Sequence, residues 1–139
     1  MYVLDTNVIL ELRKAGAGRA DANVVAWASK LATGTLYISA VTVLELELGI
    51  LSLERRDLPQ AAILRVWMQS HVLPAFVGRV LPVDKAVALQ CAQLHVPNRR
   101  AERDAMIAAT AMVHGMSVVT RNVTDFEGTG AMLVNPWVP

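Results

Sequence analysis

The stretch Met1-Tyr2-Val3-Leu4-Asp5-Thr6-Asn7 decides the fold of this chain. Its apolar run indicates a short buried strand over residues 2–4, and three polar residues end that run abruptly. The apolar spacing then becomes helical, with one face formed by Val8, Ile9 and Leu12 and the opposite face by Glu11, Arg13 and Lys14. Asp5 therefore stands where a buried strand ends and a helix begins. Parallel α/β sheets bind ligands outside the carboxyl ends of their strands, so Asp5 is either a helix cap or a site residue.

The composition favours one compact α/β unit. The chain has 139 residues, of which 54% are hydrophobic and 18% are charged. This length predicts a single domain over residues 1–139, and the apolar balance suits helices that cover both faces of a sheet. No apolar run is long enough to span a membrane, and the N-terminus lacks the basic segment of a signal peptide. The lone Cys91 cannot form an internal disulfide, so we expect a cytoplasmic protein.

Strand and helix patterns alternate along the rest of the chain. The expected helices cover residues 23–31, 42–51, 59–72, 85–94 (capped by Asp84) and 102–114. The expected strands cover residues 36–38, 80–83, 117–119 and 132–134. Residues 95–101 and 120–130 are expected loops, and the second has room for a helical turn. Such alternation implies right-handed crossovers, and we expect a three-layer α/β/α fold around a mainly parallel sheet of roughly five strands.

Four acidic residues each have an ordinary structural explanation. Asp5 could cap the first helix, and Glu45 stands three residues after Thr42, which matches a capping box. Asp104 lies in the first turn of its helix, where the helix dipole favours a negative charge. Asp125 lies in a polar loop, where an Asx-turn is a common use.

Their combined placement points to chemistry. Asp5 and Asp125 each follow a strand, Glu45 opens the helix after the second strand, and Asp104 opens the helix that leads into the fourth. In a parallel sheet all of them lie near the carboxyl edge. Several carboxylates that converge there repel one another unless cations are bound, and oxygen-rich sites suit Mg²⁺ and Mn²⁺.

Other chemistries have no support in the sequence. The chain has no P-loop, no G-x-G-x-x-G and no nucleophile elbow. A zinc site is excluded because the three histidines are isolated and are expected at helix ends or on the surface: His71, His95 and His114. A divalent-cation site made of carboxylates is therefore the only catalytic chemistry that the sequence offers.

Four ordered segments resemble the motifs of PIN-domain ribonucleases, particularly the VapC-like toxins of the FitB-like branch. These segments are Leu4-Asp5-Thr6-Asn7, the run over residues 39–46, the run over residues 104–111 and the run over residues 119–126. The likeness extends through the closing Asn135-Pro136-Trp137, so it covers essentially the whole chain. Each motif alone is weak, whereas four in order at compatible spacing are a strong signal.

The resemblance implies a Mg²⁺- or Mn²⁺-dependent endoribonuclease that acts as the toxin of a type II toxin–antitoxin pair. Its metal-site acids would be Asp5, Glu45 and Asp104. The fourth position is open between Asn122, where the family often has an acid, and Asp125, which we favour. One or two ions would activate water and stabilise the leaving oxygen of an RNA phosphodiester.

Neighbouring residues are candidates for supporting roles. Asn7 could orient a ligand carboxylate, although an ordinary capping role is equally compatible with its position, and Thr120 would supply a hydroxyl. The net charge of +1 provides no global basic field, so RNA binding would depend on local clusters. Candidate phosphate contacts, which could equally be a solvated charged face, are Arg99, Arg100, Arg103 and Arg121. Because aromatic residues make up only 5%, we expect a structured RNA such as tRNA or rRNA to be recognised by its backbone and shape.

Partners follow from the resemblance and from the apolar composition. The family implies a homodimer and a small DNA-binding, VapB-like antitoxin that blocks the pocket, with operator DNA bound only through that antitoxin. The apolar helix over residues 41–51 and the helix of Trp67 and Met68 fit the core better than an interface, yet so apolar a chain suggests some covered surface.

Two other functions use the same residues. A phosphohydrolase of small phosphate esters would use these carboxylates, but the Asp-x-Asp-x-Thr start of such enzymes would need an acid where Asn7 stands. A catalytically inactive PIN-like scaffold would bind partners without metal.

Overall fold

A computed structural model describes all of residues 1–139 and contains a five-stranded, all-parallel sheet. The strand order is β3-β2-β1-β4-β5, so the N-terminal strand lies at the centre. Tyr2 of β1 pairs with Leu36 on one side and with Ser117 on the other. The strands are β1 Tyr2–Leu4, β2 Leu36–Ser39, β3 Val80–Leu81, β4 Ser117–Val119 and β5 Leu133–Val134. The expected parallel α/β sheet is confirmed.

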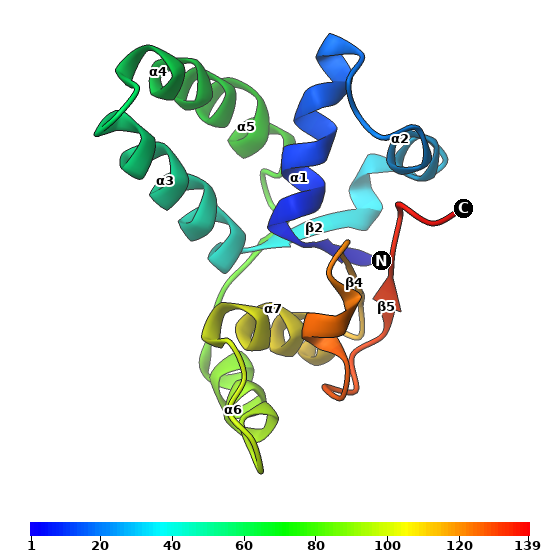
Figure 1. Cartoon of the computed structure of the whole chain (residues 1–139). Helices are drawn as coiled ribbons and strands as arrows, with labels where there is room; N and C mark the ends of the chain where they lie inside the picture. Colours follow the sequence, from blue (N-terminus) through cyan, green and yellow to red (C-terminus); the bar gives the residue numbers. More distant parts are fainter.

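Helices cover both faces of this sheet. Figure 1 shows α1, α3, α4 and α5 on one side and α6 with α7 on the other. The α-helices are α1 Thr6–Arg13, α2 Ala22–Ser29, α3 Ala40–Glu54, α4 Leu58–Trp67, α5 Leu73–Ala75, α6 Lys85–Leu94 and α7 Glu102–Val113. The remaining turns are η1 Lys14–Ala17, η2 Thr33–Thr35, the π-helical η3 Met68–Val72 and η4 Val123–Phe126. The three layers predicted from the alternation of patterns are present.

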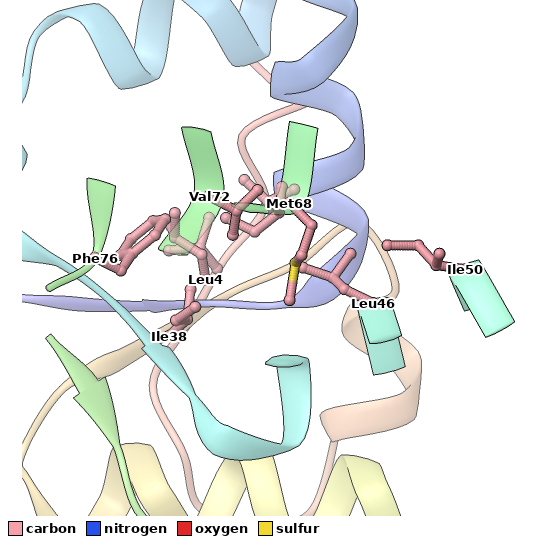
Figure 2. Packing of buried hydrophobic residues seen from close by; sticks show 10 residues of the cluster. Leu4, Ile38, Leu46, Ile50, Met68, Val72 and Phe76 are labelled. Atoms are coloured by element: carbon pink, nitrogen blue, oxygen red, sulfur yellow. The ribbon is translucent and has the colours of Figure 1, made fainter. Parts of the chain in front are cut away.

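Adjacent residues of β1 point into separate cores, because successive side chains of a strand face opposite sides. Leu4 packs in a cluster with residues of α3 and η3 and with Phe76, which directly follows α5. Figure 2 shows this cluster, including Ile38, Leu46 and Met68. On the opposite face, the neighbouring core consists of Val3, Val41, Ile107, Ala108, Ala111, Met116, Val118 and Phe126. The small residues of α7 allow this helix to lie close to the sheet.

Several element ends differ from those predicted. The helix expected at 42–51 begins at Ala40, and the pattern expected at 59–72 is divided between α4 and the π-helical η3. The strand expected at 80–83 ends at Leu81, because Pro82 has no N–H for the ladder. The strand expected at 132–134 begins at Leu133.

The prediction that Glu11 points away from the core is wrong. Glu11 is only 9% exposed, because its carboxylate accepts the backbone N–H of Asp21 at 2.8 Å and pairs with Lys14 at 3.2 Å. This fixes the chain between α1 and α2. None of the helices has the length and apolar character that a membrane crossing requires.

Candidate active site

Four carboxylates from separate elements gather at the carboxyl edge of the sheet. Asp5 follows β1, Glu45 belongs to α3 after β2, Asp104 lies in the first turn of α7, and Asp125 lies in η4 after β4. Burial raises the pKa of Asp104 to about 6, and the negative charges of Asp5, Asp125 and Glu45 add to that effect. The structure therefore brings all four predicted acids close enough to influence one another.

Asp5 is the most enclosed of the four carboxylates and is held by three donors. Only 6% of the residue is exposed. Its Oδ1 accepts the backbone N–H of Thr6 at 2.8 Å, and its Oδ2 accepts the Thr120 hydroxyl at 2.8 Å and the Asn7 amide at 3.2 Å. Burial raises the pKa of Asp5 more than the bonds from Thr120 and Thr6 lower it. Asp5 thus caps α1 and also belongs to the acidic edge, by which we mean the four carboxylates of Asp5, Glu45, Asp104 and Asp125.

Asn7 and Thr120 join the ends of the two central strands. The Asn7 amide donates to the Thr120 hydroxyl at 3.3 Å, and its carbonyl oxygen accepts the backbone N–H of Arg121 at 3.3 Å. The Thr120 oxygen also accepts the backbone N–H of Asn122 at 3.0 Å. Asn122 itself is exposed and makes no side-chain cap bond at the start of η4. These contacts fix Asp5 from both sides.

The capping-box interpretation of Glu45 is wrong. The cap of α3 is Ser39, whose hydroxyl accepts the backbone N–H of Val41 at 3.0 Å, so Glu45 lies one turn further into the helix than that motif requires. Its Oε1 instead accepts the Thr6 hydroxyl at 2.7 Å, and its Oε2 lies 3.6 Å from Nη1 of Arg103.

Two hydroxyls at this edge were not predicted. Thr6 contacts Glu45 and also lies 3.1 Å from the hydroxyl of the fully buried Thr42. The role of Thr6 could have been inferred from its position between Asp5 and Asn7. Thr42 gave a misleading signal, because its spacing to Glu45 resembles a capping box.

The donor chemistry of this edge fits a hard divalent cation. The carboxylates of Asp104 and Asp125 make no hydrogen bond or ion pair with the protein, and a cation would offset the burial and the neighbouring negative charges that raise the pKa of Asp104. As the side chains stand, no three or more His, Cys, Asp or Glu residues are grouped closely enough to hold a metal ion. The two oxygens of Glu45 contact the Thr6 hydroxyl and the Arg103 guanidinium.

The predicted phosphate-binding arginines have different surroundings. Arg100 is committed to the protein, since its guanidinium donates to the carbonyl oxygens of Leu94 at 3.1 Å and Glu127 at 2.8 Å. Arg121 lies over the Trp137 ring, 5.5 Å from its centroid, and Arg99 is exposed. The structure brings Arg103 to the carboxylates, and the backbone of Arg121 is bonded to Asn7 at the same edge.

The comparison with known families agrees with this geometry. A sequence model of the PIN domain matches residues 2–130. The chain belongs to the PIN domain family. The VapC ribonuclease Y4jK of Sinorhizobium fredii is 41% identical, and the match covers 100% of this chain and 99% of that protein. The toxin FitB of Neisseria gonorrhoeae is 36% identical over 99% of each chain.

Solved PIN-domain structures have the same fold over the full length. The crystal structure of FitAcB from Neisseria gonorrhoeae has a TM-score of 0.89 and 35% identity, with 100% of both chains covered. A structure of FitAB bound to an IR36 DNA fragment has a TM-score of 0.86 and 37% identity, with 99% of this chain and 96% of that chain covered. This PIN protein is a toxin ribonuclease of the VapC/FitB type, from a type II toxin–antitoxin system.

Proposed function

We propose that this chain, acting as one nuclease domain over residues 1–139, hydrolyses RNA phosphodiester bonds at the acidic edge with Mg²⁺ or Mn²⁺. The observation that carries the proposal is the convergence of four carboxylates from four elements; burial, with the added negative charges of the other three acids, raises the pKa of Asp104 to about 6. When these carboxylates are ionised at neutral pH, their mutual repulsion destabilises the fold, and a bound cation offsets this repulsion. The VapC/FitB relatives support the nuclease activity.

The residues divide into ligands and groups that hold the ligands in place. Asp5 and Asp104 would hold the ion directly, and Glu45 and Asp125 would hold it directly or through water, with Asn122 as a neutral oxygen donor beside them. A bound Mg²⁺ or Mn²⁺ supplies Lewis acidity that activates water for attack and stabilises the departing oxygen.

The supporting groups control the geometry and charge of these ligands. Thr120 and Asn7 fix the orientation of Asp5 through their bonds at 2.8 and 3.2 Å, and Thr6 fixes Glu45. Arg103 lies 3.6 Å from Glu45, and its positive charge opposes the rise in the pKa of Asp104 that burial and the neighbouring acids cause.

The direct test is cleavage of a mixed tRNA and rRNA pool by the isolated chain. We expect fragments from the native chain with Mg²⁺ or Mn²⁺, none in EDTA, and none from Asp5→Asn or Asp104→Asn with metal. The matched control is Asp84→Asn, which removes an acid that caps α6 away from the edge. Cleavage in EDTA, or by the two edge variants at the native rate, would contradict the proposal.

We propose that an antitoxin binds the apolar groove that leads away from the acidic edge. This groove, with a volume of about 240 Å³, begins at Thr6 and Glu45 and continues between α1, α3 and α4. Its apolar lining consists of Leu10, Leu46, Ile50, Leu53, Leu64 and Trp67. A partner segment here would cover apolar surface and reach the carboxylates. The partner would be a small VapB-like DNA-binding protein, so operator DNA would be bound only through it.

An apolar stripe on α3 supports a homodimer. Leu44, Leu48 and Leu51 share one side of this helix and remain 52%, 46% and 48% exposed, while its other side is buried in the core. A second copy of the chain would cover this stripe. Sedimentation at micromolar concentration should give a dimer for the native chain and a monomer for Leu48→Lys, and a monomeric native chain would overturn the proposal.

A further inference from the structure

A second charged cavity lies away from the carboxylates and carries the opposite charge. Its volume is about 340 Å³, and it lies between the C-terminal end of α1 with η1 and the face of α4 and η3. Its lining residues are Arg13, Lys14, Ala17, Arg19, Ile63, Val66, Trp67 and His71. No acidic side chain lines this cavity. We call it the basic pocket.

Two of its cations have no acidic partner. The guanidinium of Arg13 lies over the Trp67 ring, 5.6 Å from its centroid, and Arg19 makes no side-chain hydrogen bond or ion pair. Lys14 pairs only with Glu11, at 3.2 Å. Both arginines therefore retain forked N–H donors, which suit an anionic oxygen ligand.

The position of Arg19 depends on an ordered turn. Gly18 adopts a left-handed conformation with φ of +69°, and the next backbone N–H, that of Arg19, donates to the carbonyl of Lys14 at 3.1 Å. Glu11 then holds the chain through the N–H of Asp21 at 2.8 Å. The loop that carries Arg19 is thus tied to α1, so the pocket is built by the fold rather than by free side chains.

The basic pocket supplies positive charge for RNA binding, which the acidic edge lacks. The four carboxylates repel a phosphate backbone, while Arg100 donates to backbone carbonyls and Arg103 pairs with Glu45. Because α1 begins beside the carboxylates at Thr6 and ends at Arg13, the pocket lies about 10 Å along that helix at 1.5 Å per residue. A single RNA strand can extend over such a distance.

Resting on the proposed nuclease function, we propose that the basic pocket binds a phosphodiester of the RNA substrate outside the cleavage site. Arg13 and Arg19 would contact the phosphate oxygens, and Lys14 would add charge. The pocket would contact the backbone and not a base, because the guanidinium of Arg13 lies over the Trp67 ring on which a base would stack. An acidic peptide is the competing ligand, and its binding is an outcome of the test.

The test measures binding of a mixed tRNA pool in EDTA, where cleavage does not interfere, over a range of salt concentrations. Arg13→Gln/Arg19→Gln should raise the dissociation constant at least fivefold. It should also reduce the slope of log K against log salt by about 0.7, which is the contribution of one lost phosphate contact on a single strand. Arg19→Gln alone, which disturbs no packing contact, should give about half of that change. The charge-matched control is Lys30→Gln/Lys85→Gln, two exposed lysines on other surfaces, and it should bind like the native chain.

Each other outcome is decisive. Equal affinity and equal slope for the arginine variants and the lysine control would overturn the proposal. Unchanged tRNA binding together with lost binding of a polyglutamate peptide would overturn it in favour of a protein ligand. Cleavage by the native chain with Mn²⁺, combined with native-like tRNA binding by the double variant, would reject the pocket alone. Binding through the pocket without any cleavage would reject the nuclease proposal alone.

Discussion

The hydroxyl of Thr120 donates a 2.8 Å hydrogen bond to Oδ2 of Asp5, across the buried boundary between β4 and β1. These residues are 115 positions apart in the sequence, so the bond forms only when the two strands pair side by side. Parallel pairing of Leu4 with Val119 puts the next residue of each strand at the same edge. The sheet register therefore determines which hydroxyl restrains the most buried carboxylate.

Replacing Thr120 by Val should raise the pKa of Asp5 further, because this bond lowers it. The substitution leaves a buried acceptor short of a donor, so we expect unfolding to require about 1–3 kcal/mol less free energy at neutral pH. Affinity for Mn²⁺ should fall about 10- to 100-fold. Thr110→Val is the matched control, because its buried hydroxyl bonds only to the backbone of α7. Carbon-13 NMR of Asp5 that titrates identically in both variants would exclude this role for Thr120.

The stability of the metal-free protein should depend on the ionisation of Asp104. Its pKa is raised from 3.8 to about 6 in the folded state, so protonation favours folding. This contribution is fully present below pH 3.8 and is lost as the pH rises through about 6. Asp104→Asn should therefore stabilise the metal-free chain at pH 7.5, by about 1 kcal/mol after allowance for solvent screening, with no gain at pH 3.5.

Urea unfolding at both pH values measures this effect. Glu127→Gln, which removes an exposed carboxylate outside the edge, should change stability by less than about 0.5 kcal/mol at either pH. Equal effects of Asp104→Asn at pH 3.5 and pH 7.5 would show that burial and the neighbouring acids do not raise the pKa of Asp104.

Ser39 should matter more for α3 than its sequence context indicates. Its hydroxyl accepts the N–H of Val41 at 3.0 Å and caps the helix that carries Glu45. Ser39→Ala should lower the free energy of unfolding by about 1 kcal/mol, with an upper value near 2 because the site is buried. Ser52→Ala, at an exposed position of the same helix, should be nearly neutral. Similar thermal denaturation midpoints for the two variants would argue against the cap.

Phe126 anchors the turn that carries Asp125. Its side chain is 1% exposed within the core on the α7 face of the sheet, next to the exposed Asp125. Phe126→Ala should cost about 3–5 kcal/mol, and Phe126→Leu less than about 1.5 kcal/mol. We expect the milder variant to fold and to weaken Mn²⁺ affinity through Asp125. Unchanged affinity in Phe126→Leu would mean that Asp125 does not depend on this anchor.

The architecture and the acidic edge were predictable because both arise from local patterns. The change of apolar period at Asp5 marks the end of β1, and in a parallel sheet this places the acid at the carboxyl edge. The alternation of helices and strands then restricts the topology. Asp5, Glu45, Asp104 and Asp125 were all expected there, and the structure places them there; their roles as ligands stay predictions.

Contacts between distant segments were not predictable. Ser39 and Thr42 are both plausible caps, and only the strand pairing of β2 decides between them. Arg100 resembles a free cation in the sequence, but in the fold its guanidinium donates to two backbone carbonyls. The basic pocket is likewise formed by residues of α1, η1, α4 and η3, and no local sequence pattern predicts that these elements meet.

The most direct test of the metal site is calorimetric titration of the metal-free chain with Mn²⁺ at pH 7.5. We predict saturable binding by the native chain, binding weakened at least tenfold in Asp5→Asn and Asp104→Asn, and native-like binding in Asp84→Asn. Binding should also raise the thermal denaturation midpoint of the native chain, because only the folded state holds the site. Absence of binding, or equal binding by all four proteins, would contradict a metal site at this edge and leave its carboxylates as structural residues.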